Sequence, residues 1–305
     1  MSVPTMRPTL RLGTRASTLA KIQSGLVADA ISGSVELIEI STTGDRSRAP
    51  VTELGGTGVF VSALRDALLA GDIDLAVHSY KDLPTAPAPG LTLAAVPERE
   101  DPRDALVARD GLRLDELPTG ARVGTGAPRR VAQLRAARPD LELVAIRGNV
   151  DTRLRMVTEG RLDAVVVAMA GLSRLGRTNV VTEPLDPTLL LPAPAQGALA
   201  IECRDDDLDL VARLTELDHP ASRAAVTAER ALLATLEAGC SAPLGALAEN
   251  KDDTLVLRGV VASLDGTTAV RREATGSITD AARLGHGLAT ELLAAGVSDL
   301  LGSSR

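Results

Sequence analysis

Short runs of aliphatic and β-branched residues alternate with helical runs along most of this 305-residue chain. A strand is expected over 9–13, followed by a helix that Ser17 caps, and the segment 35–40 alternates as a second strand. A helix over 58–71 then leads to a mostly apolar, buried strand over 73–80. This alternation predicts α/β architecture.

The strand–helix cycle stops once and then starts again. Charged residues and a proline interrupt the apolar pattern at 98–104, and a strand over 121–125 with a helix over 128–137 follows. From residue 220 onward the pattern changes to a long helix, a hairpin and a last helix. We therefore expect two α/β lobes and a small α+β domain. The expected boundaries are 1–98 with 198–217 for the first lobe, 103–192 for the second lobe, and 220–305 for the third domain.

Composition excludes several kinds of partner. Phe60 and Tyr80 are the only aromatic residues, so the core is aliphatic and stacking platforms for single-stranded nucleic acid are missing. The net charge of −7 also disfavours a phosphate backbone as partner. Three histidines and two cysteines are too few and too scattered for a metal site. With no apolar run long enough for a signal peptide or membrane span, we expect a cytoplasmic protein that binds neither nucleic acid nor membrane.

Arginines recur where expected strands give way to helices. Arg15 lies in GTRAS, Arg129 and Arg130 lie in GTGAPRR, and Arg147 and Arg153 lie in RGNVDTR. In open α/β sheets, ligands bind outside the carboxyl ends of the strands, where helix N-termini favour anions. None of these loops has the lysine that a P-loop requires. The set predicts a ligand rich in carboxylates, although any single arginine can equally be a solvated surface residue.

Lys81 and Asp82 follow the buried strand in the motif HSYKDLP. A carboxylate at this place can act as a general acid or base, or it can stabilise a developing cation. The alternative interpretation is an aspartate that only caps the turn. The residues alone leave both open.

One of the two cysteines, Cys240, lies in a loop of small residues after a long helix, in TLEAGCSAPL. The C-terminal end of a helix raises the pKa of a nearby thiol, which disfavours a nucleophilic or redox cysteine. Cys203 is expected to be a small buried apolar residue. A loop thiol among small residues is still suited to carrying a covalently attached group.

Taken together, these motifs resemble those of the porphobilinogen deaminase family of tetrapyrrole and haem biosynthesis, with actinobacterial members most similar. The matching motifs, in order from about Arg11, are GTRAS, GDR, HSYKDLP, EREDPRDAL, RRVAQL, RGNVDTRL, AGLSRLG, LPAPAQGALAIECR and EAGCSAPLG. The resemblance implies a monomeric transferase that deaminates four porphobilinogen molecules and joins them head to tail on a covalent dipyrromethane primer. Hydroxymethylbilane and ammonia are the implied products. The implied fold has two lobes like those of periplasmic binding proteins.

The resemblance also implies residue roles. Cys240 would carry the dipyrromethane cofactor through a thioether, and Asp82 would be the catalytic carboxylate that promotes loss of the amino group. Other cofactor contacts fall on Lys81, Asp82, Thr125, Gly126, Arg129 and Arg130. Substrate contacts fall on Arg15, Ser17, Gln23, Phe60, Arg147, Arg153, Arg174 and Gln196.

Two positions depart from the family pattern. Gly126 stands in TGAPRR where the family commonly has a serine, so a hydroxyl contact to the cofactor is absent. Thr57 stands in GGTG where a lysine is common. Neither departure affects Asp82 or Cys240.

Of two other function classes, one remains as an alternative and the other is disfavoured. An anion-binding receptor module with two lobes explains the arginines but leaves Asp82 and Cys240 unused. A thiol hydrolase requires an activated cysteine near a histidine, which the scattered histidines do not provide. A receptor would bind carboxylates reversibly, whereas a deaminase would release ammonia from porphobilinogen.

Overall fold

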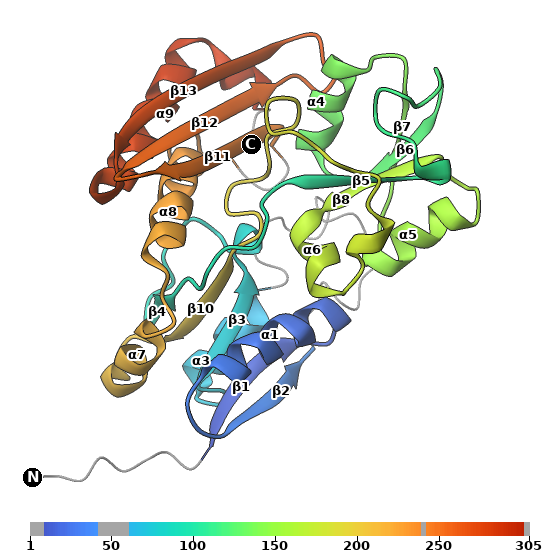
Figure 1. The fold of residues 1–305 in the computed structure, drawn as a ribbon. Coiled ribbons are helices and arrows are strands. Elements are labelled where there is room, and N and C mark those ends of the chain that lie inside the picture. Colours follow the sequence, from blue (N-terminus) through green and yellow to red (C-terminus); the bar gives the residue numbers. More distant parts are fainter. Residues whose placement is uncertain (1–8, 42–60, 239–241, 302–305) are drawn as a thin grey trace, which may run out of the picture. The chain divides into compact units, whose positions relative to one another are not determined.

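The computed structural model describes residues 9–41, 61–238 and 242–301. The chain divides into two compact units, one formed by Met1–Glu98 with Leu199–Pro220 and the other by Arg99–Ala198 with Ala221–Arg305. The first unit holds one described sheet and the second holds two (Figure 1). The predicted fold class, two α/β lobes with a small α+β domain, is confirmed. The three domain boundaries expected from the sequence stay a prediction.

The first unit, called here the first lobe, is built on a five-stranded sheet with the order β2-β1-β3-β10-β4. β1 pairs in parallel with β2 and β3, whereas β10 is antiparallel to both of its neighbours. Leu12 and Leu75 in the central strands are fully buried, as in a sheet that is covered on both faces. The strands are β1 (Leu10–Arg15), β2 (Val35–Ile40), β3 (Leu75–Ser79), β4 (Leu91–Ala95) and β10 (Leu199–Arg204).

Helices pack against both faces of this sheet. α1 and α7 share one core with it, which includes Val27, while α3 packs Leu64 into a second core. Ser17 caps α1 as predicted, because its hydroxyl accepts a hydrogen bond from the backbone of Ala20 at 3.3 Å. Gly71 ends α3 with φ 76°, a conformation that glycine adopts without strain. The helices are α1 (Thr18–Ala30), α3 (Ser62–Ala70) and α7 (Leu208–Thr215).

Residues 99–198 of the second unit, called here the second lobe, repeat this arrangement of parallel and antiparallel strands. Their sheet has the order β7-β6-β8-β5-β9, in which β6 is parallel to β7 and β8, and β5 is antiparallel to its neighbours. The sequence pattern did not predict β5, because its apolar residues follow directly on a charged run. The strands are β5 (Asp104–Ala108), β6 (Arg122–Thr125), β7 (Glu142–Ala145), β8 (Ala164–Ala168) and β9 (Glu183–Pro184).

The second lobe also has helices on both faces of its sheet. α4 packs Leu134 into one core, and α5 and α6 pack Val157 and Leu172 into the other. Pro128 opens α4, where a missing N–H costs nothing. β8 ends at Ala168, and α6 begins at the next residue. The helices are α4 (Pro128–Ala137), α5 (Val150–Thr158) and α6 (Met169–Arg174).

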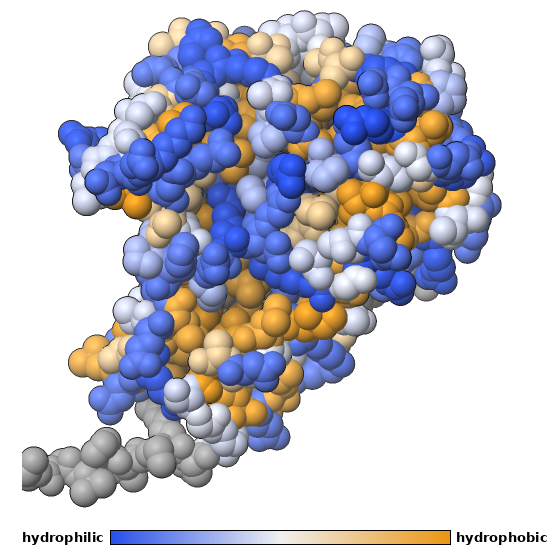
Figure 2. All heavy atoms as spheres, in the orientation of Figure 1, coloured by the Kyte–Doolittle hydropathy of each residue, from blue (hydrophilic) through white to orange (hydrophobic). Residues whose placement is uncertain are grey.

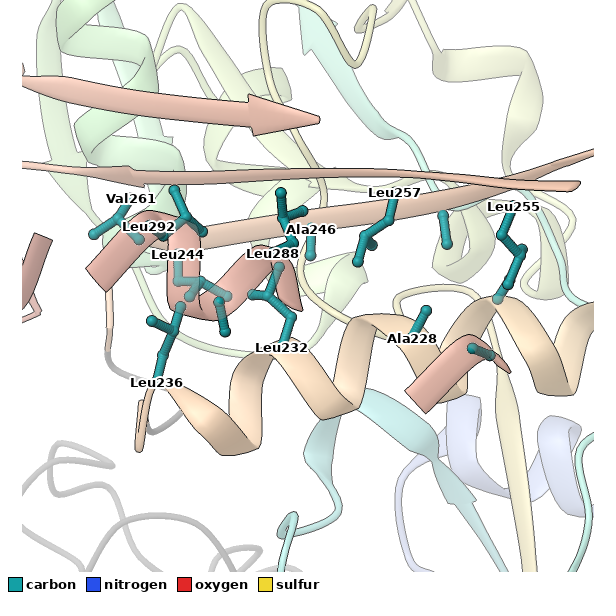
Figure 3. Close-up of a cluster of buried hydrophobic side chains, with 14 of the residues drawn as sticks. Ala228, Leu232, Leu236, Leu244, Ala246, Leu255, Leu257, Val261, Leu288 and Leu292 are labelled. Carbon is teal, nitrogen blue, oxygen red and sulfur yellow. The ribbon is translucent and has the colours of Figure 1, made fainter. Parts of the chain in front are cut away.

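Residues 221–301 of the second unit form the C-terminal domain, a three-stranded antiparallel sheet in the order β11-β12-β13. Leucine and alanine side chains fill the space between one face of this sheet and helices α8 and α9 (Figure 3). On the other face Arg258 binds Glu249 and Glu273, one on each neighbouring strand. Figure 2 shows mainly hydrophilic side chains where Figure 1 draws β13. The elements are β11 (Leu244–Lys251), β12 (Thr254–Ala262), β13 (Ala269–Ser277), α8 (Pro220–Thr235) and α9 (Ala281–Ala294).

Short 3-10 turns connect several elements. They are η1 (Tyr80–Asp82), η2 (Arg109–Gly111), η3 (Thr178–Val180), η4 (Ile278–Asp280) and η5 (Val297–Leu300).

No helix in the described ranges has both the length and the apolar character that crossing a membrane requires.

Candidate active site

The chain leaves β3 through the single turn η1, and Asp82 is the last residue of that turn. The turn is closed by the backbone of Leu83, which donates to the carbonyl of Tyr80 at 3.2 Å. The half-buried carboxylate of Asp82 has no hydrogen-bond or ion-pair partner within the described ranges. A turn-capping aspartate would accept backbone N–H groups. The geometry therefore favours a carboxylate that is open to a ligand over one that only caps the turn.

Asp82 lines a small pocket at the carboxyl ends of β1 and β3. Arg15 enters this pocket from the end of β1, Gln23 from α1 and Ser79 from the end of β3. The amide nitrogen and the amide oxygen of Gln23 both lie within hydrogen-bond distance of the hydroxyl of Ser79, at 3.1 and 3.3 Å. Ser17 lies at the start of α1, where its hydroxyl is used as the cap. The first-lobe pocket thus gathers a carboxylate, a guanidinium and an amide.

A buried charged cluster lies beside this pocket. His78, which also lines the pocket, places Nε2 3.2 Å from Oε2 of Glu202. Arg65 binds both carboxylate oxygens of Glu202, at 2.7 and 3.0 Å. Burial alone would raise the pKa of Glu202, but His78 and Arg65 outweigh burial and lower this pKa to about 2. Glu202 therefore remains ionised inside the first lobe. No local sequence pattern indicates this charged cluster, because Glu202 and Arg65 are far apart along the chain.

In the second lobe, the paired arginines occupy the first turn of α4 and are almost fully buried. Both bind Asp104, which lies at the start of β5 and is 0% exposed. Nη1 of Arg129 lies 2.7 Å from Oδ2, and Nη2 and Nε of Arg130 lie 2.7 and 3.1 Å from Oδ1. Burial alone would raise the pKa of Asp104, but the two guanidinium groups hold it well below its usual range. Sequence reasoning singled out the arginines and missed the carboxylate that binds them.

Arg153 adds a third cation to this part of the second lobe. Its Nε donates to the carbonyl of Gly148 at 2.9 Å, and none of the described carboxylates pairs with it. Burial, followed by repulsion from Arg130 and Arg147, lowers the pKa of Arg153 to about 10. The group is therefore charged at neutral pH, and an anion placed beside it would be stabilised. Arg147 itself is exposed.

The remaining predicted residues of the second lobe are engaged with the backbone or with Asp104. Arg174 donates to the carbonyl of Gly197 at 2.7 Å, and burial lowers the pKa of its guanidinium. The amide nitrogen of Gln196 lies 2.8 Å from both Oδ1 of Asp104 and the carbonyl of Pro102. Gln196 is thus part of the surroundings of Asp104.

The loop before α4 explains one departure from the family pattern. The side chain of Thr125 is buried, and Gly126 follows it directly. A Cβ atom on Gly126 would lie 2.5 Å from the carbonyl oxygen of Ile146. A serine therefore does not fit this backbone without a shift, so the missing hydroxyl has a steric cause in this chain.

Three residues singled out in the sequence lie outside the described residues, namely Cys240, Phe60 and Thr57. Cys203 is buried in the core of the first lobe as predicted, and burial raises the pKa of its thiol to about 11. No cluster of three or more possible metal ligands was found in the described ranges.

Residues 10–212 match the family model described as porphobilinogen deaminase, dipyromethane cofactor binding domain, and residues 223–294 match the porphobilinogen deaminase C-terminal domain. The chain is 60% identical to a porphobilinogen deaminase of Nocardia farcinica, covering 96% of this chain and 88% of that protein. It is 58% identical to porphobilinogen deaminase 1 of Streptomyces coelicolor, with 96% and 97% covered. Identity to a porphobilinogen deaminase of Mycobacterium tuberculosis is also 58%, with 96% and 98% covered.

Likeness to the solved structures is weaker. The VFT2 domain of BvgS from Bordetella pertussis aligns with a TM-score of 0.41 and 17% identity, over 69% of this chain and 87% of that one. The two family models together match most of the chain, and the actinobacterial relatives match 96% of it at 58–60% identity. This chain therefore belongs to the porphobilinogen deaminase family.

Proposed function

We propose that this chain is the transferase that deaminates porphobilinogen and joins four units head to tail on a covalent dipyrromethane primer. Water then cleaves the bond between the primer and the four joined units, which releases hydroxymethylbilane. Family membership supports the reaction, and one observation supports the catalytic residue. The half-buried carboxylate of Asp82 lines a pocket with Arg15 and Gln23, and it has no partner within the described ranges.

The described residues of the second lobe fit the dipyrromethane cofactor, whose pyrrole rings carry acetate and propionate groups. Among the described residues, Asp104 is the one carboxylate that pairs with Arg129, Arg130 or Arg153, so this region carries excess positive charge. Guanidinium groups suit carboxylates because their N–H donors match both oxygens. When bound, the primer supplies the pyrrole carbon onto which the first unit is joined.

The proposed anchor of the primer is Cys240, through a thioether, as the family resemblance implies. Gly239 and Ser241 flank this cysteine, so little side-chain bulk hinders an attached group. The proposed non-covalent contacts are Lys81, Asp82, Thr125, Gly126, Arg129 and Arg130.

Asp82 has two proposed tasks on the substrate. Its carboxylate accepts a hydrogen bond from the pyrrole N–H, which orients the ring. When the aminomethyl C–N bond breaks and ammonia leaves, positive charge develops on the pyrrole, and the negative carboxylate stabilises it. The new C–C bond then forms with loss of a proton from the attacked pyrrole carbon. Proposed substrate contacts are Arg15, Ser17, Gln23, Phe60, Arg147, Arg153, Arg174 and Gln196.

We also propose that the protein acts as a cytoplasmic monomer. Size-exclusion chromatography with light scattering tests the oligomeric state, and a mass twice that of the chain would contradict it.

A reversible anion receptor is the second candidate, and the buried arginines of the second lobe favour it. Incubation of the purified, primed protein with porphobilinogen separates the two functions. We expect one ammonia released for each porphobilinogen consumed, together with a linear tetrapyrrole product. Porphobilinogen bound but recovered unchanged would instead support the receptor.

A further inference from the structure

The most completely buried charged cluster of the second lobe is centred on Asp104, to which the known motifs assign no role. Its carboxylate accepts four hydrogen bonds, one from Arg129, two from Arg130 and one from Gln196. The four donor–acceptor distances are 2.7–3.1 Å. Nη1 of Arg129 also donates to the carbonyl of Leu191, at 2.6 Å. The side chains of Asp104, Arg129 and Arg130 are 0%, 5% and 6% exposed, and the residue Gln196 is 1% exposed.

Asp104 is needed for two cations to be buried side by side. Arg129 and Arg130 both lie in the first turn of α4, where the helix dipole already disfavours positive charge. Two adjacent buried guanidinium groups without an anion would repel each other and lose their hydration. Asp104 balances one of the two charges and leaves a net positive charge at this place.

The two arginines use their donors differently. In Arg130 all three side-chain nitrogens donate inside the protein, with Nε and Nη2 on Asp104 and Nη1 on the carbonyl of Val166 at 3.0 Å. In Arg129 only Nη1 does so, to Asp104 and Leu191. Within the described ranges, Nε and Nη2 of Arg129 have no partner. Those two atoms form one planar edge of the guanidinium, and that edge matches a carboxylate with two parallel hydrogen bonds.

We propose that Asp104 is a positioning residue, which orients Arg129 so that its Nε–Nη2 edge binds a carboxylate of the cofactor, and that Arg130 holds Asp104 in addition to its proposed cofactor contact. This inference deepens the proposed function and rests on it. It predicts that cofactor loading depends on a carboxylate that does not touch the cofactor.

The test measures loading of the primer rather than turnover. Cofactor-free protein, made in a host that cannot synthesise porphobilinogen, is incubated with hydroxymethylbilane, and the gain in intact mass is followed over time. Thermal unfolding is measured on the same samples. We expect Asp104→Asn to load about tenfold to a hundredfold more slowly, the effect of losing one charge-assisted hydrogen bond.

The double variant Asp104→Asn with Arg130→Gln separates positioning from stability. It removes one negative and one positive charge together, so we expect its unfolding temperature to exceed that of Asp104→Asn. Loading should stay slow, because Arg129 has lost the group that orients it. A double variant that is restored in both stability and loading rate would overturn the proposal, as would Asp104→Asn loading like the unmodified chain.

A single arginine variant tests the orientation of Arg129. We expect Arg129→Gln to load more slowly than the unmodified chain, and an unchanged loading rate would overturn the proposed role of the Nε–Nη2 edge. The matched control is Asp140→Asn, which removes an aspartate–arginine pair with Arg138 at the other end of α4. Its loading rate should be unchanged. If the unmodified chain never gains the primer mass, the proposed function itself fails, and this outcome is distinct from a failure confined to Asp104.

Discussion

Asp82 and Asp104 are aspartates in opposite surroundings. Asp82 is half-buried and unpartnered within the described ranges, whereas Asp104 is fully buried and accepts four hydrogen bonds. A carboxylate that is not engaged by the protein can respond to charge that develops on a substrate. One that is fully engaged can only hold its neighbours in place. We therefore propose a chemical role for Asp82 and a positioning role for Asp104.

The first prediction concerns Asp82. We expect Asp82→Asn to keep the fold and lose at least about a hundredfold in turnover of porphobilinogen, because the amide carries no charge to stabilise the cationic pyrrole. Ammonia release measures turnover, and circular dichroism checks the fold. The matched control is Asp66→Asn, an exposed aspartate of α3 in the same lobe, which should retain full activity. Substantial activity in Asp82→Asn would remove Asp82 from the central role.

The second prediction concerns the loop before α4. Gly126→Ala and Gly126→Ser should each destabilise the protein by about 1–3 kcal/mol, because either side chain places a Cβ against the carbonyl oxygen of Ile146. Urea unfolding of both variants measures the loss. If the serine variant is as stable as the unmodified chain, the steric explanation of this departure from the family pattern is wrong.

At the scale of elements, hydrophobic periodicity predicted α4 from Pro128 to Ala137 and β2 from Val35 to Ile40, with the bounds that the structure has. Both have strong local signals: a proline at the first helical position in α4 and an alternating pattern in β2. β5 was missed because it is short and begins with Asp104, the last residue of a charged run. The negative charge of Asp104 made β5 hard to predict from the sequence. In the fold, Arg129 and Arg130 of α4 bind this charge, and these residues are far from Asp104 along the chain.

The third prediction compares two glycines of α9. A Cβ on Gly285 would lie 2.2 Å from the carbonyl oxygen of Ala228 in α8, whereas nothing lies within 4 Å of one on Gly287. We expect Gly285→Ala to destabilise the C-terminal domain by about 1–3 kcal/mol through overpacking. Gly287→Ala should instead stabilise it by up to about 1 kcal/mol, because alanine favours a helix. Thermal unfolding of both variants checks this, and similar effects would contradict the close packing of α8 and α9.

At the scale of the whole molecule, the sequence predicted two α/β lobes and an α+β domain because the strand–helix cycle stops and restarts. The sequence pattern also predicted arginines near the carboxyl ends of strands. In the structure Arg15 ends β1, and Arg129 and Arg130 lie in the first turn of α4. The buried charge clusters were not predictable in this way. Glu202 and Arg65 are separated by 137 residues, and no local pattern pairs a carboxylate with a distant guanidinium.

The fourth prediction follows from these buried carboxylates. The pKa of Glu202 falls from an ordinary 4.5 to about 2 on folding, and that of Asp104 falls as well. Because the folded values are the lower ones, their stabilising contribution is present above the unfolded pKa and is lost as pH falls from about 5 toward 2. For Glu202 this amounts to at most about 3 kcal/mol.

Urea unfolding as a function of pH tests this prediction. Glu202→Gln should be less stable near neutral pH, and its stability should fall less steeply between pH 5 and 2 than that of the unmodified chain. An identical pH slope in the variant would show that Glu202 does not have the depressed pKa.

The central claim is a dipyrromethane primer attached to Cys240, and the intact mass of the purified protein tests it most directly. We expect the unmodified chain to exceed its sequence mass by two linked pyrroles, and Cys240→Ser to lack this addition. The control Cys203→Ala changes the other cysteine, which is buried in the first lobe, and it should keep the addition. A chain of bare sequence mass that hydroxymethylbilane fails to modify, or an addition that persists in Cys240→Ser, would contradict the account.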